Sequence, residues 1–176
     1  MMIGGNRMFR SWKFLFLVAA SIFLLAACGQ SLEDRAVEGV KAAEEVFYAN
    51  DKESTDEIDG IKLYKPMGFD VVDDSDTQNI VFEKGKDPFI LFVNPNEEKD
   101  SHLFYDLLLA DKNLDIIAEA QFDEEDTFGF VAVIQHDDAS IELVASVGGA
   151  KMTTLTIEKN VTEYLESMMG VVRSIK

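Results

Sequence analysis

The sequence predicts an α+β fold in which an antiparallel β-sheet is flanked by helices and preceded by an N-terminal helix. Two observations lead to this prediction. Apolar residues recur at spacings of three and four in the segments 31–49, 101–111 and 161–175, which is the period of an amphipathic helix. Most of the chain between 61 and 157 instead alternates with a period of two between clusters of turn-forming residues, which is typical of strands. Consecutive strands with helices beside them favour an antiparallel sheet.

The segment 1–27 is expected to be a secretory signal peptide and not part of the fold. Its apolar run at 14–27 is interrupted only by Ser21 and has 14 residues. A membrane-spanning helix needs roughly 20 residues, whereas the hydrophobic region of a signal peptide needs about 7–15. Met1 and Met8 both fit as the starting residue, because basic residues lie between each of them and the apolar run.

The sequence Leu25-Ala26-Ala27-Cys28-Gly29 resembles the lipobox of bacterial lipoproteins. The resemblance implies that a diacylglyceryl group is attached to the Cys28 thiol and that the signal is cut just before this residue. Cys28 is therefore the expected lipidation site and the membrane is one expected partner, through the lipid. Two acyl chains anchor a protein durably. The expected location is the extracytoplasmic face of the cell membrane. The envelope type, Gram-positive or Gram-negative, stays open.

The charge is strongly acidic and unevenly distributed. The chain has 16 basic and 33 acidic residues, and only Arg7, Arg10 and Lys13 among these precede Cys28, so the mature part carries a formal charge of −20. Such a field repels nucleic acid and anionic headgroups, so no nucleic-acid partner is expected. Two interpretations stay open: solubility at a crowded membrane surface, or attraction of a cationic partner or divalent metal.

The segment 28–59 is expected to contain the lipidated cysteine, a helix and an acidic linker. The helix spans 31–49 and carries one apolar stripe, and a polar stretch at 50–59 follows it. The helix either packs on the following domain or forms a partly independent stalk, and the stripe favours packing. No cysteine follows Cys28, so the exported domain has no internal disulfide.

The segment 60–176 is expected to be the α+β domain itself. Its clearest strand pair is a hairpin of 128–134 against 141–147, and a helix is expected at 101–111. The last helix is predicted to begin at the N-cap Asn160, with Glu163 completing a capping box. The other expected strands lie at 61–64, 69–72, 79–83, 89–93, 114–122 and 152–157.

The span from about 61 to 176 resembles the PsbP-like family, which includes bacterial DcrB-type lipoproteins. The features that carry the resemblance are a strand that leads into Pro66-Met67-Gly68-Phe69, strands with an inserted helix, a late hairpin and a final helix. The resemblance implies a noncatalytic assembly or binding module. It transfers no functional residue to this chain, and a fold alone does not establish a function.

Residues able to support chemistry are scarce. The sequence has no nucleophile elbow and no zinc-ligand pattern, and its two histidines, His102 and His136, are expected to be exposed or capping residues. Acidic clusters occur at 73–76, 123–126 and 136–138, where turn chemistry is the main interpretation. Asp73, Asp74 and Asp76 are the best candidates for a Ca²⁺ site, although the EF-hand pattern is missing.

These observations predict a membrane-anchored extracytoplasmic lipoprotein that is a noncatalytic binding or assembly module. It is not expected to be an enzyme or to hold a cofactor, and its expected macromolecular partner is a protein. The alternative is a small-ligand or Ca²⁺-binding lipoprotein, which would need a well-formed pocket or a cage of carboxylates.

Overall fold

The computed structural model describes residues 30–72 and 79–175, and the chain from Leu32 onward forms one compact unit. Its helices are separated by runs of consecutive strands and form an α+β fold with them, which confirms the predicted fold class. The elements are α2 (Leu32–Ala49), β1 (Asp56–Ile58), β2 (Ile61–Leu63), β3 (Asp70–Val71), β4 (Asn79–Lys84), β5 (Asp87–Val93), α3 (Leu103–Ala110), β6 (Asp115–Glu124), β7 (Thr127–Gln135), β8 (Ile141–Val147), β9 (Ala150–Thr156), a 3₁₀ turn (Glu158–Asn160) and α4 (Val161–Ser174).

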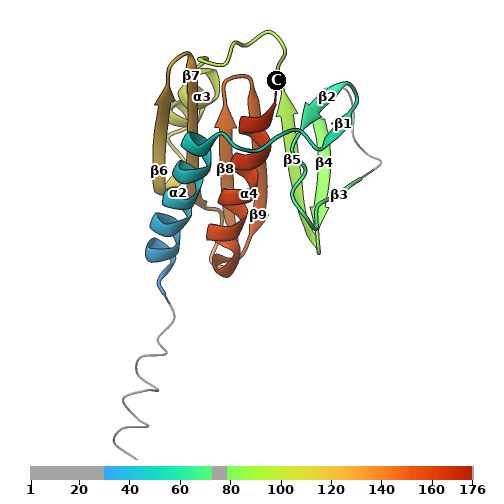
Figure 1. Cartoon of the computed structure of the whole chain (residues 1–176). Coiled ribbons are helices and arrows are strands. Elements are labelled where there is room, and N and C mark those ends of the chain that lie inside the picture. Colours follow the sequence, from blue (N-terminus) through green and yellow to red (C-terminus); the bar gives the residue numbers. More distant parts are fainter. Residues whose placement is uncertain (1–29, 73–78, 176) are drawn as a thin grey trace, which may run out of the picture. The chain divides into compact units, whose positions relative to one another are not determined.

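Seven strands form one antiparallel sheet in the order β3-β4-β5-β9-β8-β7-β6 (Figure 1). The hairpin expected between 128–134 and 141–147 is present as β7 and β8, with Gly129 opposite Val147 and Gln135 opposite Ile141. Strand β9 pairs with both β8 and β5, so it joins the two halves of the sheet.

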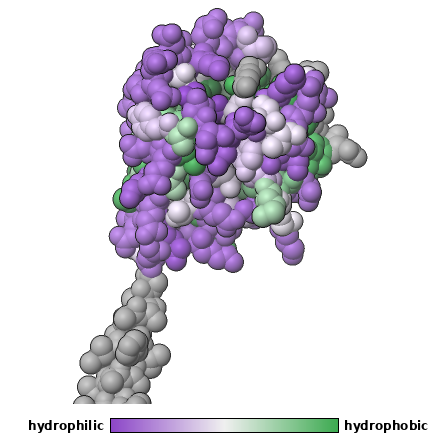
Figure 2. Space-filling view, viewed as in Figure 1, coloured by the Kyte–Doolittle hydropathy of each residue, from purple (hydrophilic) through white to green (hydrophobic). Residues whose placement is uncertain are grey.

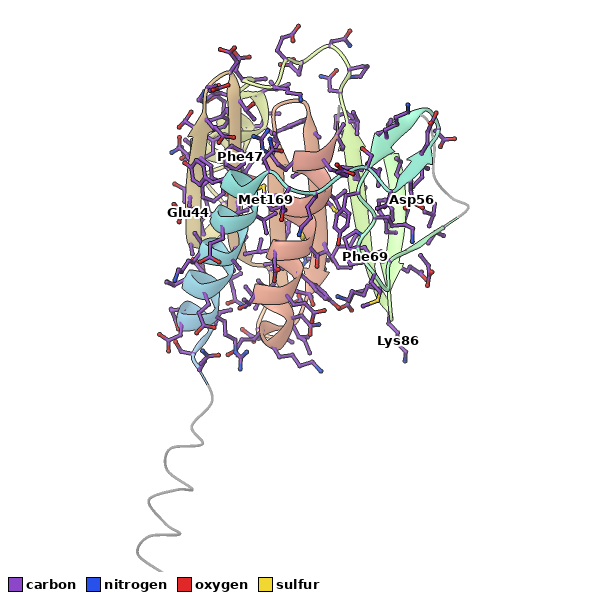
Figure 3. All side chains as sticks on the ribbon, viewed as in Figure 1. Glu44, Phe47, Asp56, Phe69, Lys86 and Met169 are labelled. Carbon is purple, nitrogen blue, oxygen red and sulfur yellow. The ribbon has the colours of Figure 1, made fainter. Side chains whose placement is uncertain are left out.

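Helices α2 and α4 cover one face of the sheet and α3 lies on the opposite face (Figure 1). Of the two arrangements that the sequence leaves open for the N-terminal helix, the structure shows the packed one. At the crossing of α2 and α4, a Cβ atom on Gly39 would lie 2.9 Å from Leu165 Cδ1, so the absence of a side chain allows the close approach. Figure 3 labels Phe47 on α2 and Met169 on α4, both fully buried.

Strand β1 lies within the segment 50–59, which the sequence predicts to be a polar linker. It pairs with β2 through a two-residue turn at Asp59-Gly60, where both residues have positive φ, 50° and 82°. Asp-Gly is a strong signal for such a turn, because both central positions of this turn type require positive φ. The signal was present in the sequence but stood at the end of an acidic stretch.

The capping box predicted at the start of α4 is wrong. The Asn160 side chain caps no backbone N–H of the helix. Its Nδ2 instead donates to Asp87 Oδ2 at 3.2 Å and to Thr156 Oγ1 at 3.0 Å. A preceding 3₁₀ turn leads into the helix, so Asn160 itself adopts helical φ and ψ and its side chain turns toward β5 and β9.

Candidate functional site

The predicted site residues fall largely outside the described residues. Cys28 lies there, and so do the Ca²⁺ candidates Asp73, Asp74 and Asp76. Across residues 30–72 and 79–175, no group of three or more His, Cys, Asp or Glu side chains is arranged to hold a metal ion.

The two other acidic clusters have structural contacts. Asp137 Oδ1 accepts the backbone N–H groups of Ala139 and Ser140, each at 2.8 Å, in the turn between β7 and β8. The Ser140 hydroxyl, together with these N–H groups, lowers the pKa of the Asp137 carboxyl. In the cluster at 123–126, Glu124 pairs with Arg173 of α4 at 2.5 Å. The Asp137 contacts stabilise the β7–β8 turn, and the Glu124–Arg173 pair joins the end of β6 to α4.

The two histidines lie on separate elements. The His102 ring, directly before α3, stacks on Phe128 with ring centroids 3.7 Å apart and an angle of 20° between the planes. His136 is exposed in the β7–β8 turn, where its backbone N–H donates to Ser140 O. His102 therefore packs against the ring of Phe128 at the start of α3, and His136 belongs to a surface turn.

Cross-strand register assigns each side chain of the sheet to a face. Directly opposed residues share a face, and alternate residues of one strand point to opposite faces. In β5, Phe89 and Leu91 point toward α2 and α4 and are fully buried, whereas Ile90 points the other way and is 46% exposed. Phe92 also lies on this second face, where its ring contacts Phe104 of α3 at a centroid distance of 5.9 Å.

Helix α3 covers the part of this second face that lies over β6, β7 and β8, and through Phe104 it reaches the last residues of β5 and the first residues of β9. The residues beneath it include Phe128, Phe130 and Ile134, which form a small core with Phe104 and Leu108. Within residues 30–72 and 79–175, the part that lies over β4, over β5 up to Ile90 and over the end of β9 has no helix on it. We call it the open sheet face and define it by four side chains: Val81, Pro88, Ile90 and Leu155. Ile90, Pro88 and Leu155 are exposed and Val81 is half-buried.

The side of α3 next to the open sheet face is also apolar. Phe104 marks that side, because its ring contacts Phe92 and lies 5.2 Å from Lys151 Nζ of β9. Leu107, three residues later on the helix, lies on the same side and is 57% exposed. The open sheet face is thus bounded by a leucine-bearing helix along one edge.

Carboxylates bound the open sheet face along a second edge. Glu83 is directly opposite both Asp70 of β3 and Pro88 of β5, and Glu142 is directly opposite Leu155. These residues therefore form one row across the strands, in the order Asp70, Glu83, Pro88, Leu155, Glu142. We call its three carboxylates the acidic row. Among the described residues, no Lys or Arg forms an ion pair with any of them.

A cavity of about 370 Å³ lies at the end of the molecule where the loop after β5 crosses the β8–β9 turn. We call it the loop cavity. Its walls include Ile61, Val93 and Val172, and its polar lining includes Lys99 and Glu97. Its size is near the lower end of the range for small-molecule sites, about 300–1,000 Å³.

The glycine pair of the β8–β9 turn allows the loop to approach. A Cβ atom on Gly148 would lie 2.5 Å from Glu98 O, and one on Gly149 would lie 2.5 Å from Asn94 O. The Asn94 N–H also donates to Gly149 O at 2.8 Å. In the sequence the two glycines indicate only a turn. In the structure they allow the loop after β5 to pack closely on the β8–β9 turn, and this loop forms part of the cavity wall.

Asp87 is the most heavily hydrogen-bonded carboxylate of the helix-covered side. Its Oδ2 accepts from Tyr164 Oη at 2.9 Å and from Thr156 Oγ1 at 3.1 Å, in addition to Asn160. Burial, followed by this contact with Asp87, raises the pKa of Tyr164 to about 12. The cluster ties the start of β5 to the end of β9 and the first turn of α4.

Sequence reasoning did not find the open sheet face. The run 89–93 is apolar at every position, so it does not reveal which alternate residues a helix covers. The available signal was the alternation in β9, where Leu155 follows Lys151 and Thr153 on the second face as its one apolar residue.

Within the described residues, no helix is long and apolar enough to cross a membrane. No family model matches this chain, and no curated protein is significantly similar to it.

Proposed function

We propose that this protein is a lipid-anchored extracytoplasmic lipoprotein that acts as a noncatalytic binding or assembly module for a protein partner. Anchoring is supported by the order of basic segment, apolar run and lipobox, which ends at Cys28. The α+β fold is compatible with the PsbP-like resemblance, and we keep that family as part of the proposal.

One observation carries the binding role: the open sheet face. Ile90 and Leu155 are 46% and 44% exposed on the interior strands β5 and β9, where sheet residues are usually covered. Contiguous exposed apolar surface is a mark of protein–protein contact sites. The face that carries α2 and α4 is, by contrast, dominated by hydrophilic residues in Figure 2.

Lipid anchoring is tested by intact mass and by incorporation of labelled fatty acid in cells that express the full chain. We expect a mature protein that begins at Cys28 and carries the mass of a diacylglyceryl group. The Cys28→Ser variant is the matched control, and it should retain the signal and take up no label. Equal labelling of both proteins, or no labelling of either, would contradict the anchoring proposal.

Binding is tested by mild crosslinking of the lipidated protein in intact membranes, followed by mass spectrometry. A reproducible, stoichiometric protein partner is the expected result. A clean monomer at every crosslinker length would count against the binding module.

The loop cavity favours one alternative, a small-ligand-binding lipoprotein. Its volume and partly apolar walls are typical of a small-molecule site. A library of small ligands, and separately Ca²⁺, would be screened for a rise in melting temperature, since a ligand that binds only the folded state stabilises it. The Asp73→Asn, Asp74→Asn, Asp76→Asn triple variant is the control for Ca²⁺, because it should lose a shift caused by those carboxylates and keep one caused by the cavity.

A further inference from the structure

The open sheet face and the acidic row form a surface with two distinct zones. Val81 and Ile90 are directly opposed and form an apolar zone next to Thr153. Two residues farther along the strands, or roughly 7 Å, Pro88 and Leu155 lie between Glu83 and Glu142. A bound partner would therefore meet apolar side chains along most of the surface and carboxylates at one end.

The carboxylates at that end have no cation from the described chain. Lys84, which follows Glu83 in β4, pairs with Glu163 of α4 and lies 5.2 Å from the Tyr164 ring centroid, on the helix-covered side of the sheet. Lys151 lies over Phe104, beside α3. Lys86 projects from the β4–β5 turn in Figure 3, and no ion pair joins it to a described carboxylate.

The dimensions of the surface fit a helix. Strands β4, β5 and β9 are neighbours, and three strands span about 10 Å from the first axis to the third. An α-helix with its side chains has a diameter of about 10–12 Å. A helix laid along the strands would pack beside α3 and contact Leu107 on one side and Ile90 beneath it.

Electrostatics distinguishes between the possible partners of the open sheet face. The mature chain carries a formal charge of −20, so a second copy of this chain and an anionic lipid surface would both be repelled. A partner with lysine or arginine at one end of an apolar stripe would gain contacts on both zones. An apolar stripe alone would leave the three carboxylates without a counter-charge.

We propose that the open sheet face binds an amphipathic helix of a partner protein, with lysine or arginine residues at the helix end that meets the acidic row. The inference rests on the proposed binding function and names the surface and the chemistry of the partner. The apolar stripe of the helix packs on Ile90 and Leu155, and its basic end lies against Glu83 and Glu142.

The test uses the lipidated full-length protein in zwitterionic nanodiscs and two synthetic helical peptides with the same leucine stripe. One peptide carries three lysines in its last turn and the other carries three glutamates there. Fluorescence anisotropy measures binding, and empty nanodiscs correct for partition into lipid. We expect saturable binding of the lysine peptide and at least tenfold weaker binding of the glutamate peptide. Equal binding of the two peptides, or none, would overturn the inference.

Two variants with matched controls localise the binding. The double variant Ile90→Ser, Leu155→Ser should weaken binding of the lysine peptide at least tenfold. The control Val37→Ser removes a valine of α2 that is 64% exposed, and it should change the binding less than twofold. Glu83→Gln with Glu142→Gln should weaken it at least fivefold. Glu33→Gln with Glu44→Gln removes the same charge from exposed positions of α2 and should leave it within twofold.

Equal loss in the charge variants and their controls would mean nonspecific attraction to an acidic protein, and it would overturn the inference. Circular dichroism and melting temperatures verify that each variant is folded. Failure of this inference is distinguishable from failure of the proposed function. If crosslinking in membranes still finds a stoichiometric partner for the open-face variants, the binding module stands and the assigned surface is wrong.

Discussion

The two faces of the sheet are built from the same strands but have different surroundings. On the face covered by α2 and α4, Phe82, Phe89 and Leu91 are fully buried. On the other face of the same strands, Ile90 is nearly half exposed and Val81 is half-buried. In β5 the residues at 89–93 are apolar on both faces, so the composition of this strand does not determine which of its faces forms the core. The segments that pack on each face determine it: Tyr164 of α4 and Phe69 cover Phe89 on one side, and α3 reaches only the end of β5 on the other.

The largest expected contrast comes from two adjacent residues of β5. Leu91→Ala should lower the free energy of unfolding by about 2–5 kcal/mol, because it leaves a cavity in the main core, where Leu91 is fully buried. Ile90→Ala should lower it by about 1 kcal/mol or less, because the side chain is half exposed. Urea denaturation followed by circular dichroism measures both. Equal losses would show that the open sheet face is covered in solution, and the comparison of the two faces would then fail.

A pH dependence is expected on the helix-covered face. Burial and the hydrogen bond to Asp87 raise the pKa of Tyr164 to about 12, against about 10 in an unfolded chain. The folded state therefore holds this proton more tightly. The resulting stabilisation is full below pH 10 and is lost as the pH rises toward 12, by about 2–3 kcal/mol.

Denaturation between pH 9 and pH 12 checks this expectation. Tyr164→Phe is the comparison, and its free energy of unfolding should fall less steeply over that range than that of the unchanged protein. Since the substitution also removes one hydrogen bond to Asp87 at every pH, the slope and not the absolute value is diagnostic. Parallel curves for the two proteins would contradict the raised pKa.

Two glycines on the helix-covered side are expected to respond in opposite directions to an added methyl group. A Cβ atom on Gly129 of β7 would lie 2.7 Å from Phe47 Cε2 and 3.0 Å from Ser146 O, so Gly129→Ala should destabilise the fold by about 1–3 kcal/mol through overpacking. Gly170 of α4 meets only ordinary contacts, the nearest being Tyr64 Cδ1 at 3.5 Å. Gly170→Ala should stabilise by up to about 1 kcal/mol, since alanine favours helix. Melting temperatures that shift in the same direction for both variants would contradict the contact geometry.

The smallest expected effect lies beneath α3. Tyr105 Oη donates to Glu119 Oε1 at 3.1 Å and accepts from Gln121 Nε2 at 2.7 Å, and Tyr105→Phe removes both bonds. Because the two partners lie on exposed positions of the edge strand β6, water can replace the lost hydroxyl. The expected loss is about 0.5–1.5 kcal/mol, measured by urea denaturation. A loss as large as that of Leu91→Ala would show that the α3 side is as tightly coupled as the helix-covered side.

Periodicity in the sequence predicted the elements that carry strong local signals. The helices at 31–49 and 161–175 appear as α2 and α4, because an apolar stripe of period 3.6 buries only as a helix. The β7–β8 hairpin appears as two largely buried apolar strands on both sides of a polar turn. The capping box predicted at Asn160 is wrong, because the Asn160 side chain instead donates a hydrogen bond to Asp87, which is far away in the sequence.

The candidate site was much less predictable. The loop cavity and the open sheet face depend on which strands become neighbours. Pairing of β5 with β9, which are more than 50 residues apart in the chain, places Ile90 beside Thr153 and Pro88 near Leu155. The functional expectation from sequence instead centred on Cys28 and on Asp73, Asp74 and Asp76, all of which lie outside the described residues.

From the amino-acid sequence alone follow the strong negative charge, the fold class and the positions of the main helices and strands, together with the prediction of an export signal and of a lipidation site at Cys28. These properties depend on composition and local periodicity, which are complete within short segments. Three features became visible only in the folded chain: α2 packs on the sheet, α3 leaves Val81, Pro88, Ile90 and Leu155 uncovered, and three carboxylates form one row beside that surface. These features arise from pairing between distant segments, because the face that a strand buries depends on which segment packs on it.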